Sequence, residues 1–99
     1  MTIKKIQNGD TLTYALEGRL DSSTAPQLQE EMGDLGGVKE LIIDMNQLEY
    51  ISSAGLRVML KAQKIMIAQG SMKLVGVNSV IMEVLEMTGF SDILTVETQ

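Results

Sequence analysis

Two adjacent hydroxyl side chains, Ser52 and Ser53, have the types and the position that could support chemistry. They follow a buried-strand pattern around Leu41–Ile43 and begin a long helical pattern. A helix that starts after a strand exposes free backbone N–H groups, and the positive end of its dipole favours a phosphate there. Gly55 is expected to leave the approach to these hydroxyls open. In the simpler interpretation, one of the two serines only caps the helix, a contribution of about 1 kcal/mol.

Most enzyme classes are excluded by what the chain lacks. It has no His and no Cys, so it cannot build a Ser-His-Asp triad, a Cys nucleophile, a disulfide or a zinc site of the usual N/S type. A serine enzyme would then need a Lys base, and no S-x-x-K begins at Ser52 or Ser53. Phosphate-binding glycine motifs and EF-hand spacing are also missing. We therefore expect neither enzymatic activity nor a cofactor or metal.

The charge and hydropathy of the chain restrict its partners. Eight Lys and Arg against thirteen Asp and Glu give a net charge of −5, which disfavours binding to nucleic acid. No apolar stretch approaches the roughly 20 residues of a membrane span, and Met1–Gln7 lacks the apolar core of a signal peptide. We expect a cytoplasmic protein that does not insert into a membrane.

The 99 residues, 44% of them hydrophobic, predict a single domain spanning residues 1–99. Alternating apolar residues in Thr11–Glu17, preceded by a turn at Asn8-Gly9, predict a hairpin whose first arm is Thr2–Gln7. Further on, the patterns predict a polar connection at 18–24, a helix from Ala25 that ends at Gly36-Gly37, a strand at Val38–Met45, a loop at Asn46–Ser52, a helix at Ser53–Ala68, a strand at Met72–Val75, a helix capped by Asn78 that ends at Gly89, and a short strand or helical turn at Ile93–Val96.

The long helix has two predicted faces. The inward face is expected to carry Leu56, Met59, Leu60 and Ile67, widened by Val58, Ala62 and Ile65. The outward face carries a basic stripe of Arg57, Lys61 and Lys64, which is either a solvated face or part of a partner contact.

Strands that alternate with helices predict an α/β fold: one small domain with a mixed sheet of four to five strands, an N-terminal hairpin followed by parallel strands, and three or more helices. Loops after parallel strands gather at one sheet edge. We therefore expect Asp21, Asp44 and Ser53 to converge there, with Leu56 turned inward and Arg57 outward.

Three motifs in this order resemble the STAS domain of bacterial anti-sigma factor antagonists. They are Gly18-Arg19-Leu20-Asp21, the run from Ile42 to Leu56, and Met87-Thr88-Gly89-Phe90. The family pattern places its phosphoacceptor Ser directly after an Asp, and on this chain Ser53 takes the acceptor position. Ser52 replaces that Asp and is a second candidate acceptor, while Ala54 replaces a Ser or Thr. Asp21 and Asp44 match family positions near the acceptor.

The resemblance implies a STAS-like fold and a switch without catalysis of its own. The unphosphorylated form would bind an anti-sigma factor serine kinase through Asp21, Asp44, Ser52, Ser53, Gly55 and Arg57. Phosphorylation of Ser53 would end that binding, and a PP2C-like phosphatase would restore it. The alternative is a STAS scaffold subunit of a larger assembly, such as a transporter complex, that is never phosphorylated.

Overall fold

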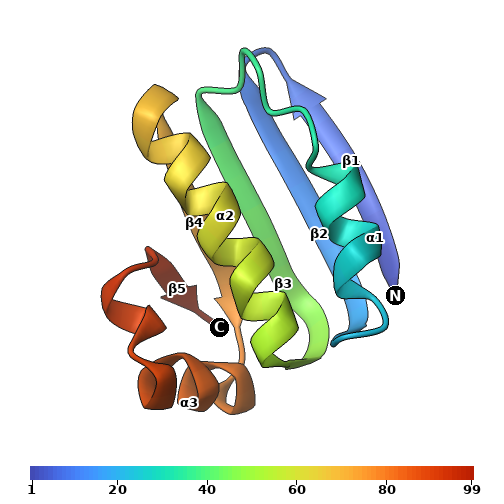
Figure 1. The fold of residues 1–99 in the computed structure, drawn as a ribbon, viewed down its shortest axis with the longest axis vertical. Coiled ribbons are helices and arrows are strands. Elements are labelled where there is room, and N and C mark those ends of the chain that lie inside the picture. Colours follow the sequence, from blue (N-terminus) through green and yellow to red (C-terminus); the bar gives the residue numbers. More distant parts are fainter.

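A computed structural model describes residues 1–99 as one α/β unit with a five-stranded mixed sheet (Figure 1). The strands are β1 (Thr2–Asn8), β2 (Thr11–Leu20), β3 (Glu40–Ile51), β4 (Ser71–Val77) and β5 (Val96–Thr98), and they lie in that order across the sheet. The helices are α1 (Ala25–Glu31), α2 (Ser53–Gln69), α3 (Ser79–Thr88) and a short 3-10 helix, η1 (Phe90–Asp92). β1 runs antiparallel to β2 and every other pair is parallel, which confirms the predicted fold class.

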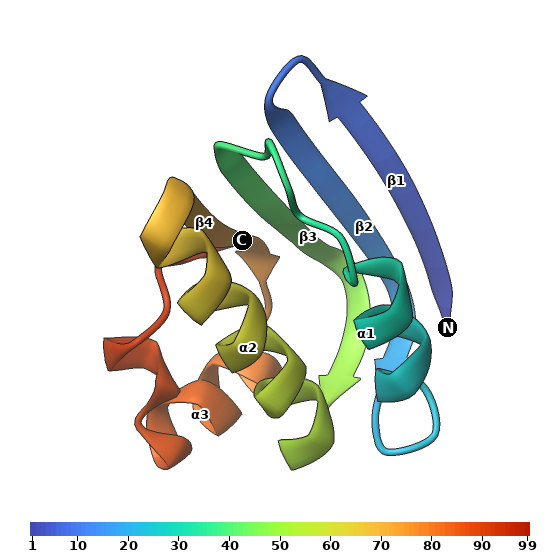
Figure 2. The same cartoon turned by 45° about the horizontal axis from the view of Figure 1, so that its top comes forward.

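Helices α1 and α2 lie side by side on one face of the sheet (Figures 1 and 2). The strands turn alternate apolar side chains toward them, and Leu12, Tyr14 and Leu16 of β2 are fully buried as the alternation predicts. The hydroxyl of Tyr14 donates to the backbone oxygen of Glu31 at 2.8 Å, which ties β2 to the end of α1. Burial, assisted by the negative charge of Glu31, raises the pKa of Tyr14.

The two central strands are longer than predicted. β2 continues to Leu20 through the expected polar connection, and β3 continues to Ile51 through the expected loop at 46–52, so both boundary predictions are wrong. The boundaries were missed because the pairing register between β2 and β3 is irregular. Ala15 pairs with Asp44 but Glu17 pairs with Gln47, and a second shift in the register follows Gly18. Such bulges break the alternation, and the buried residues of β3 become Met45, Leu48 and Ile51, three positions apart instead of two.

Helix α1 is shorter than predicted. It begins at Ala25, as expected, with Pro26 in its first turn, but it ends at Glu31 and not at Gly36-Gly37. Gly33 breaks the pattern, and its N–H closes the last turn on the carbonyl of Glu30 at 3.1 Å. Leu35 and Val38 are still buried, so the connection to β3 packs against the core without being helical.

Helix α2 is rotated relative to the predicted inward face. Its buried stripe contains Gly55, Leu56, Val58, Met59, Ala62 and Met66. Ile67 is 70% exposed and Ile65 is 46% exposed, so their predicted burial is wrong. Gly55, which the predicted face did not include, is buried and brings the first turn of the helix close to the sheet. The basic stripe of Arg57, Lys61 and Lys64 is exposed as predicted.

The C-terminal part follows the predicted capping. The side chain of Asn78 accepts the N–H of Ile81 at 2.8 Å and caps α3, and Gly89 ends the helix in the left-handed conformation with φ of 79°. Ile81 and Leu85 are the buried residues of α3, whereas Val80 is 54% exposed. The last segment forms η1, which ends just before the predicted strand or turn at Ile93–Val96, and then β5, which overlaps that prediction only at Val96.

Candidate functional site

The site forms where β2 and β3 end together. Leu20 pairs with Ile51 at the last position of the parallel ladder, and the N–H of Ser52 donates to the carbonyl of Leu20 at 2.9 Å. The chain then turns into α1 through Asp21 on one strand and into α2 through Ser53 on the other. The structure therefore brings Asp21, Ser52 and Ser53 to the same edge of the sheet.

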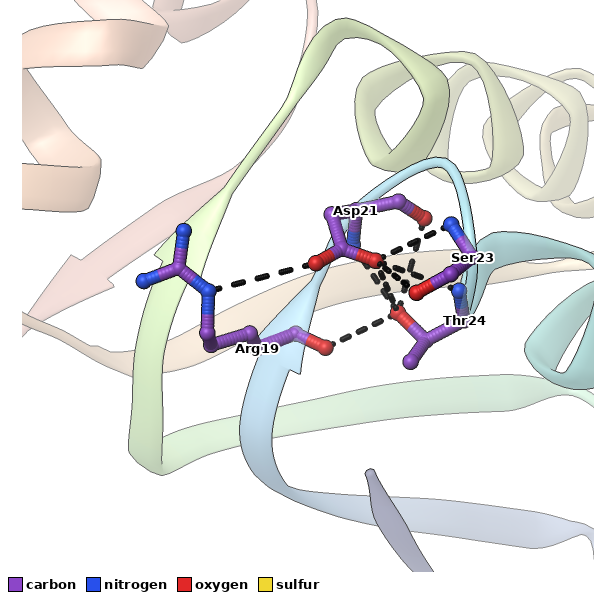
Figure 3. A network of polar contacts seen from close by, with 4 residues as sticks. All are labelled: Arg19, Asp21, Ser23 and Thr24. Atoms are coloured by element: carbon purple, nitrogen blue, oxygen red, sulfur yellow. Dashed lines mark hydrogen bonds and ion pairs between the residues drawn. The ribbon is translucent and has the colours of Figure 1, made fainter.

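Asp21 organises the turn that precedes α1 (Figure 3). Its Oδ1 accepts the N–H of Ser23 at 3.0 Å and the hydroxyl of Ser23 at 2.7 Å, and it also accepts the N–H of Thr24 at 3.2 Å. The Thr24 hydroxyl in turn donates to the backbone oxygen of Arg19 at 2.8 Å. The hydrogen bonds from Ser23, and then those from Thr24, lower the pKa of Asp21, so it is ionised in the fold at neutral pH.

Arg19 joins both strand ends and was not singled out in the sequence. Its Nε lies 3.9 Å from Oδ2 of Asp21, and its guanidinium carbon lies 4.5 Å from the ring centre of Tyr50. The ion pair is largely exposed and contributes little to stability, whereas the position over the ring is a cation–π contact. The sequence contained a signal for this contact. Arg19 lies two residues before Asp21, and Tyr50 lies two residues before Ser52, in the motifs that carry the family resemblance.

The two serines have different environments. Ser53 is the first residue of α2 and is exposed. Ser52 is the N-cap residue by its backbone conformation, but its hydroxyl caps nothing: the oxygen is buried and has no hydrogen-bond partner. Of the two hydroxyls, that of Ser53 is therefore the one a second protein can reach without a change in the fold. The first turn of α2 also has no side-chain acceptor for its free N–H groups.

Gly55 has a different role from the one its sequence position suggested. It is buried, and a Cβ added there would lie 2.6 Å from Cγ of Leu20 and 2.9 Å from Cγ1 of Ile51. Gly55 therefore faces the sheet and does not open an approach to the hydroxyls, so that expectation is wrong. It lets the first turn of α2 pack directly on the ends of β2 and β3, which fixes where Ser53 lies.

Asp44 does not join the other site residues. It lies seven residues before the end of β3, opposite Ala15 and Val75, so roughly 20 Å of strand separates it from Ile51. Its Oδ1 accepts the N–H of Asn46 at 2.9 Å and the side-chain amide of Asn46 at 2.8 Å, and these bonds shape the bulge of β3. The expected convergence of Asp44 with Ser53 is wrong because β3 does not end at Asp44.

A groove of about 530 Å³ runs between α1 and α2 beside this edge. Its lining includes Ser22 from the turn before α1, Pro26 and Glu30 from α1, and Ala54 and Arg57 from the start of α2. Leu56 is buried and Arg57 is exposed, as the helical pattern predicted. No cluster of side chains could hold a metal ion, and no helix is long and apolar enough to cross a membrane.

Comparison with known proteins identifies relatives over nearly the whole chain. The STAS domain family model matches residues 2–99. BtrV of Bordetella bronchiseptica, provisionally named as an anti-sigma factor antagonist, is 35% identical over 99 residues, covering 97% of this chain and 84% of BtrV. The anti-sigma-B factor antagonist of Listeria monocytogenes is 31% identical over 97 residues, covering 94% of this chain and 84% of the Listeria protein.

Solved structures share the fold at lower identity. A provisionally named anti-sigma factor antagonist from Thermotoga maritima has a TM-score of 0.89 at 19% identity, covering 98% of this chain and 86% of its own. Unphosphorylated SpoIIAA has a TM-score of 0.84 at 18% identity, covering 99% and 90%. The phosphorylated form of SpoIIAA from Bacillus has a TM-score of 0.76 at 18% identity, covering 99% and 93%.

Proposed function

The chain belongs to the STAS domain family, and from that premise we propose that it is an anti-sigma factor antagonist that works as a phosphorylation switch. In its unphosphorylated form it binds an anti-sigma factor that is also a serine kinase. Phosphorylation of Ser53 ends the binding, and a PP2C-like phosphatase restores it. Two curated relatives above 30% identity carry the antagonist name, which supports this role over that of a scaffold subunit in a transporter complex.

The observation that carries the proposal is the exposed hydroxyl of Ser53 at the sheet edge, next to the turn of Asp21. The buried oxygen of Ser52 argues against Ser52 as the acceptor. In the phosphoryl transfer, Ser53 Oγ forms a bond to the γ-phosphorus of ATP as the bond to the β,γ-bridging oxygen breaks. ADP leaves, and the hydroxyl proton passes to a base of the kinase or to water. The antagonist is thus a substrate and not an enzyme, and it acts in the cytoplasm, where ATP is available.

A phosphate at this position changes the charge of the docking surface. It adds about −1.5 to −2 charges to an edge that already carries the ionised Asp21. A partner surface complementary to the unphosphorylated edge would have to desolvate this added charge or meet it with a like charge. Binding is therefore expected to weaken without a change in the fold.

The proposal is tested by incubating the chain with a serine kinase of the anti-sigma factor type from the same genome and ATP, and by mapping the product with mass spectrometry. We expect one phosphate, on Ser53, and none on the Ser53→Ala variant. Phosphate on Ser52 alone would overturn the residue assignment. No phosphate with a kinase that binds the chain tightly would overturn the switch.

A further inference from the structure

Arg57 lies one helical turn after Ser53 on the exposed side of α2. We propose that Arg57 is the internal counter-ion of a phosphate on Ser53, and that phosphorylation withdraws Arg57 from the docking surface as well as adding negative charge. This inference rests on the proposed function, because it assigns the phosphate to Ser53. It goes further by naming a second residue through which the phosphate acts.

Arg57 has no competing partner in the structure. The two ion pairs present are Arg19–Asp21 and Lys73–Glu97. Glu30 of α1 is the carboxylate that lines the same groove as Arg57, and the two form no ion pair. The guanidinium is therefore free to turn toward Ser53 without breaking an existing interaction.

The spacing suits an ion pair within the helix. Side chains four residues apart lie about 5–6 Å apart at Cβ, and the pair is most favourable when the acidic member comes first, as at Ser53 and Arg57. A guanidinium binds two phosphate oxygens through parallel N–H bonds, which makes this pair stronger than one between Lys and a carboxylate.

The surroundings of Ser53 add to this preference. The first turn of α2 has no side-chain cap, so its free N–H groups and the helix dipole favour a negative charge at the same place. The N-cap residue is Ser52, which carries no charge, whereas an acidic residue there would have repelled the phosphate. The carboxylate of Asp21 at the same edge is already engaged by Ser23 and Thr24.

The consequence concerns the groove between α1 and α2. In the unphosphorylated chain, Arg57 is available at its rim to an acidic group of a partner. When the guanidinium turns to the phosphate, that positive charge is neutralised at the same time as the negative charge appears. The net change in surface charge is still that of the phosphate, about −1.5 to −2, but a partner that contacts Arg57 also loses that contact.

The experiment uses the full chain with phosphoserine incorporated at position 53 during translation, so that it does not depend on any kinase. The titration of the phosphate is followed by ³¹P NMR in this protein, in its Arg57→Gln variant and in a Lys61→Gln control on the same exposed stripe. A counter-ion holds the phosphate in its dianionic form. We therefore expect Arg57→Gln to raise the titration midpoint by roughly 0.3 pH units or more, as estimated from the strength of such helix pairs, and Lys61→Gln to leave it nearly unchanged.

Equal midpoints in the parent and in Arg57→Gln would overturn the counter-ion role, even if a kinase phosphorylates Ser53. Equal shifts in both variants would also overturn it, because they would show a general effect of charge. A shift confined to Arg57→Gln supports the role whether or not a kinase acts on Ser53. The failure of this inference and the failure of the proposed function are therefore distinguishable.

Discussion

The N–H of Ser52 donates a hydrogen bond of 2.9 Å to the carbonyl oxygen of Leu20, one residue beyond the last pair of the β2–β3 ladder. This bond holds the start of α2 against the end of β2, so the turn of Asp21 and the hydroxyl of Ser53 emerge from the sheet together. The distance between the Asp21 turn and the Ser53 hydroxyl depends on backbone hydrogen bonds and on the close packing beneath Gly55. The placement of the site is therefore a property of the strand ends and not of any side chain within it.

Gly55→Ala tests that packing. A Cβ at this position would lie 2.6 Å from Leu20, so the helix or the strand end must move. Overpacking of this kind costs about 1–3 kcal/mol, which exceeds the gain of up to about 1 kcal/mol from the better helix propensity of Ala. With the full propensity gain, we expect a net loss of up to about 2 kcal/mol in the free energy of unfolding, measured by urea denaturation.

Ala68→Gly is the matched control for that measurement, because Ala68 is an exposed position of the same helix. It reports the propensity term alone, expected at no more than about 0.5–1 kcal/mol because Ala68 lies in the last turn of α2. If Gly55→Ala stabilised the chain by the amount that Ala68→Gly destabilises it, the close approach of α2 to the sheet would be wrong.

Ser52→Ala and Asn78→Ala compare two N-cap positions. The oxygen of Ser52 is buried without a partner, so its removal is expected to change stability by less than about 0.5 kcal/mol or to raise it. Asn78 accepts the N–H of Ile81 and donates to the carbonyl of Leu48 at 3.0 Å, so its removal is expected to cost about 1 kcal/mol or more. Thermal or urea unfolding of both variants measures the difference, and a larger cost at Ser52 would contradict the caps described here.

Asp21→Asn probes the turn that precedes α1 through its pH dependence. The pKa of Asp21 is lowered in the folded state, so its carboxylate stabilises the fold above the usual value of 3.8, and this contribution is lost as pH falls through the folded pKa. The variant is therefore expected to be less stable than the parent at neutral pH, and the difference is expected to shrink in acid. The midpoints of urea unfolding of parent and variant, at neutral and at acidic pH, measure this difference in stability. Asp10→Asn, at an exposed carboxylate with no hydrogen bond, is the control.

The sequence predicted the order and type of the elements because periodicity and capping residues are local signals. Asn78 and Gly89 marked the start and the end of α3, and the structure contains both. The long β3 could not be predicted in the same way. Its bulges place Met45, Leu48 and Ile51 on one face at intervals of three, and only pairing with β2, which is distant in sequence, decides that this segment is a strand.

The candidate site was predictable where it depends on adjacent residues and not where it depends on strand length. Ser53 and Asp21 follow the last residues of two paired strands, so their expected proximity agrees with the structure. Asp44 was placed with them because β3 was predicted to end at Met45, six residues before its actual end at Ile51. The buried oxygen of Ser52 depends on how α2 packs on the strand ends, which no local pattern reports.

Arg57→Glu tests the docking surface in the unphosphorylated chain. Arg57 is exposed at the rim of the groove beside Ala54, so we expect its charge to steer association with an acidic partner surface. Reversal of this charge is expected to slow association with the kinase at low salt. The effect should fade above about 0.1 M salt, where the Debye length is below about 10 Å. Stopped-flow association rates measure it. Lys64→Glu makes the same charge change farther along α2, and an equal effect there would indicate net charge and not a contact.

Ser53→Asp and Ser53→Ala separate charge from the loss of the hydroxyl in the proposed switch. Both remove the phosphoacceptor at an exposed position, so neither is expected to disturb the fold. Ser53→Ala should keep the affinity for the kinase, whereas Ser53→Asp should weaken it only in part, because a carboxylate carries about half the charge of a phosphate. Calorimetric titration of the kinase with each variant measures the difference. A double variant, with Arg57→Gln added to Ser53→Asp, shows whether the weakening of binding depends on Arg57. Equal affinities of the kinase for Ser53→Ala and Ser53→Asp would contradict an electrostatic switch at Ser53.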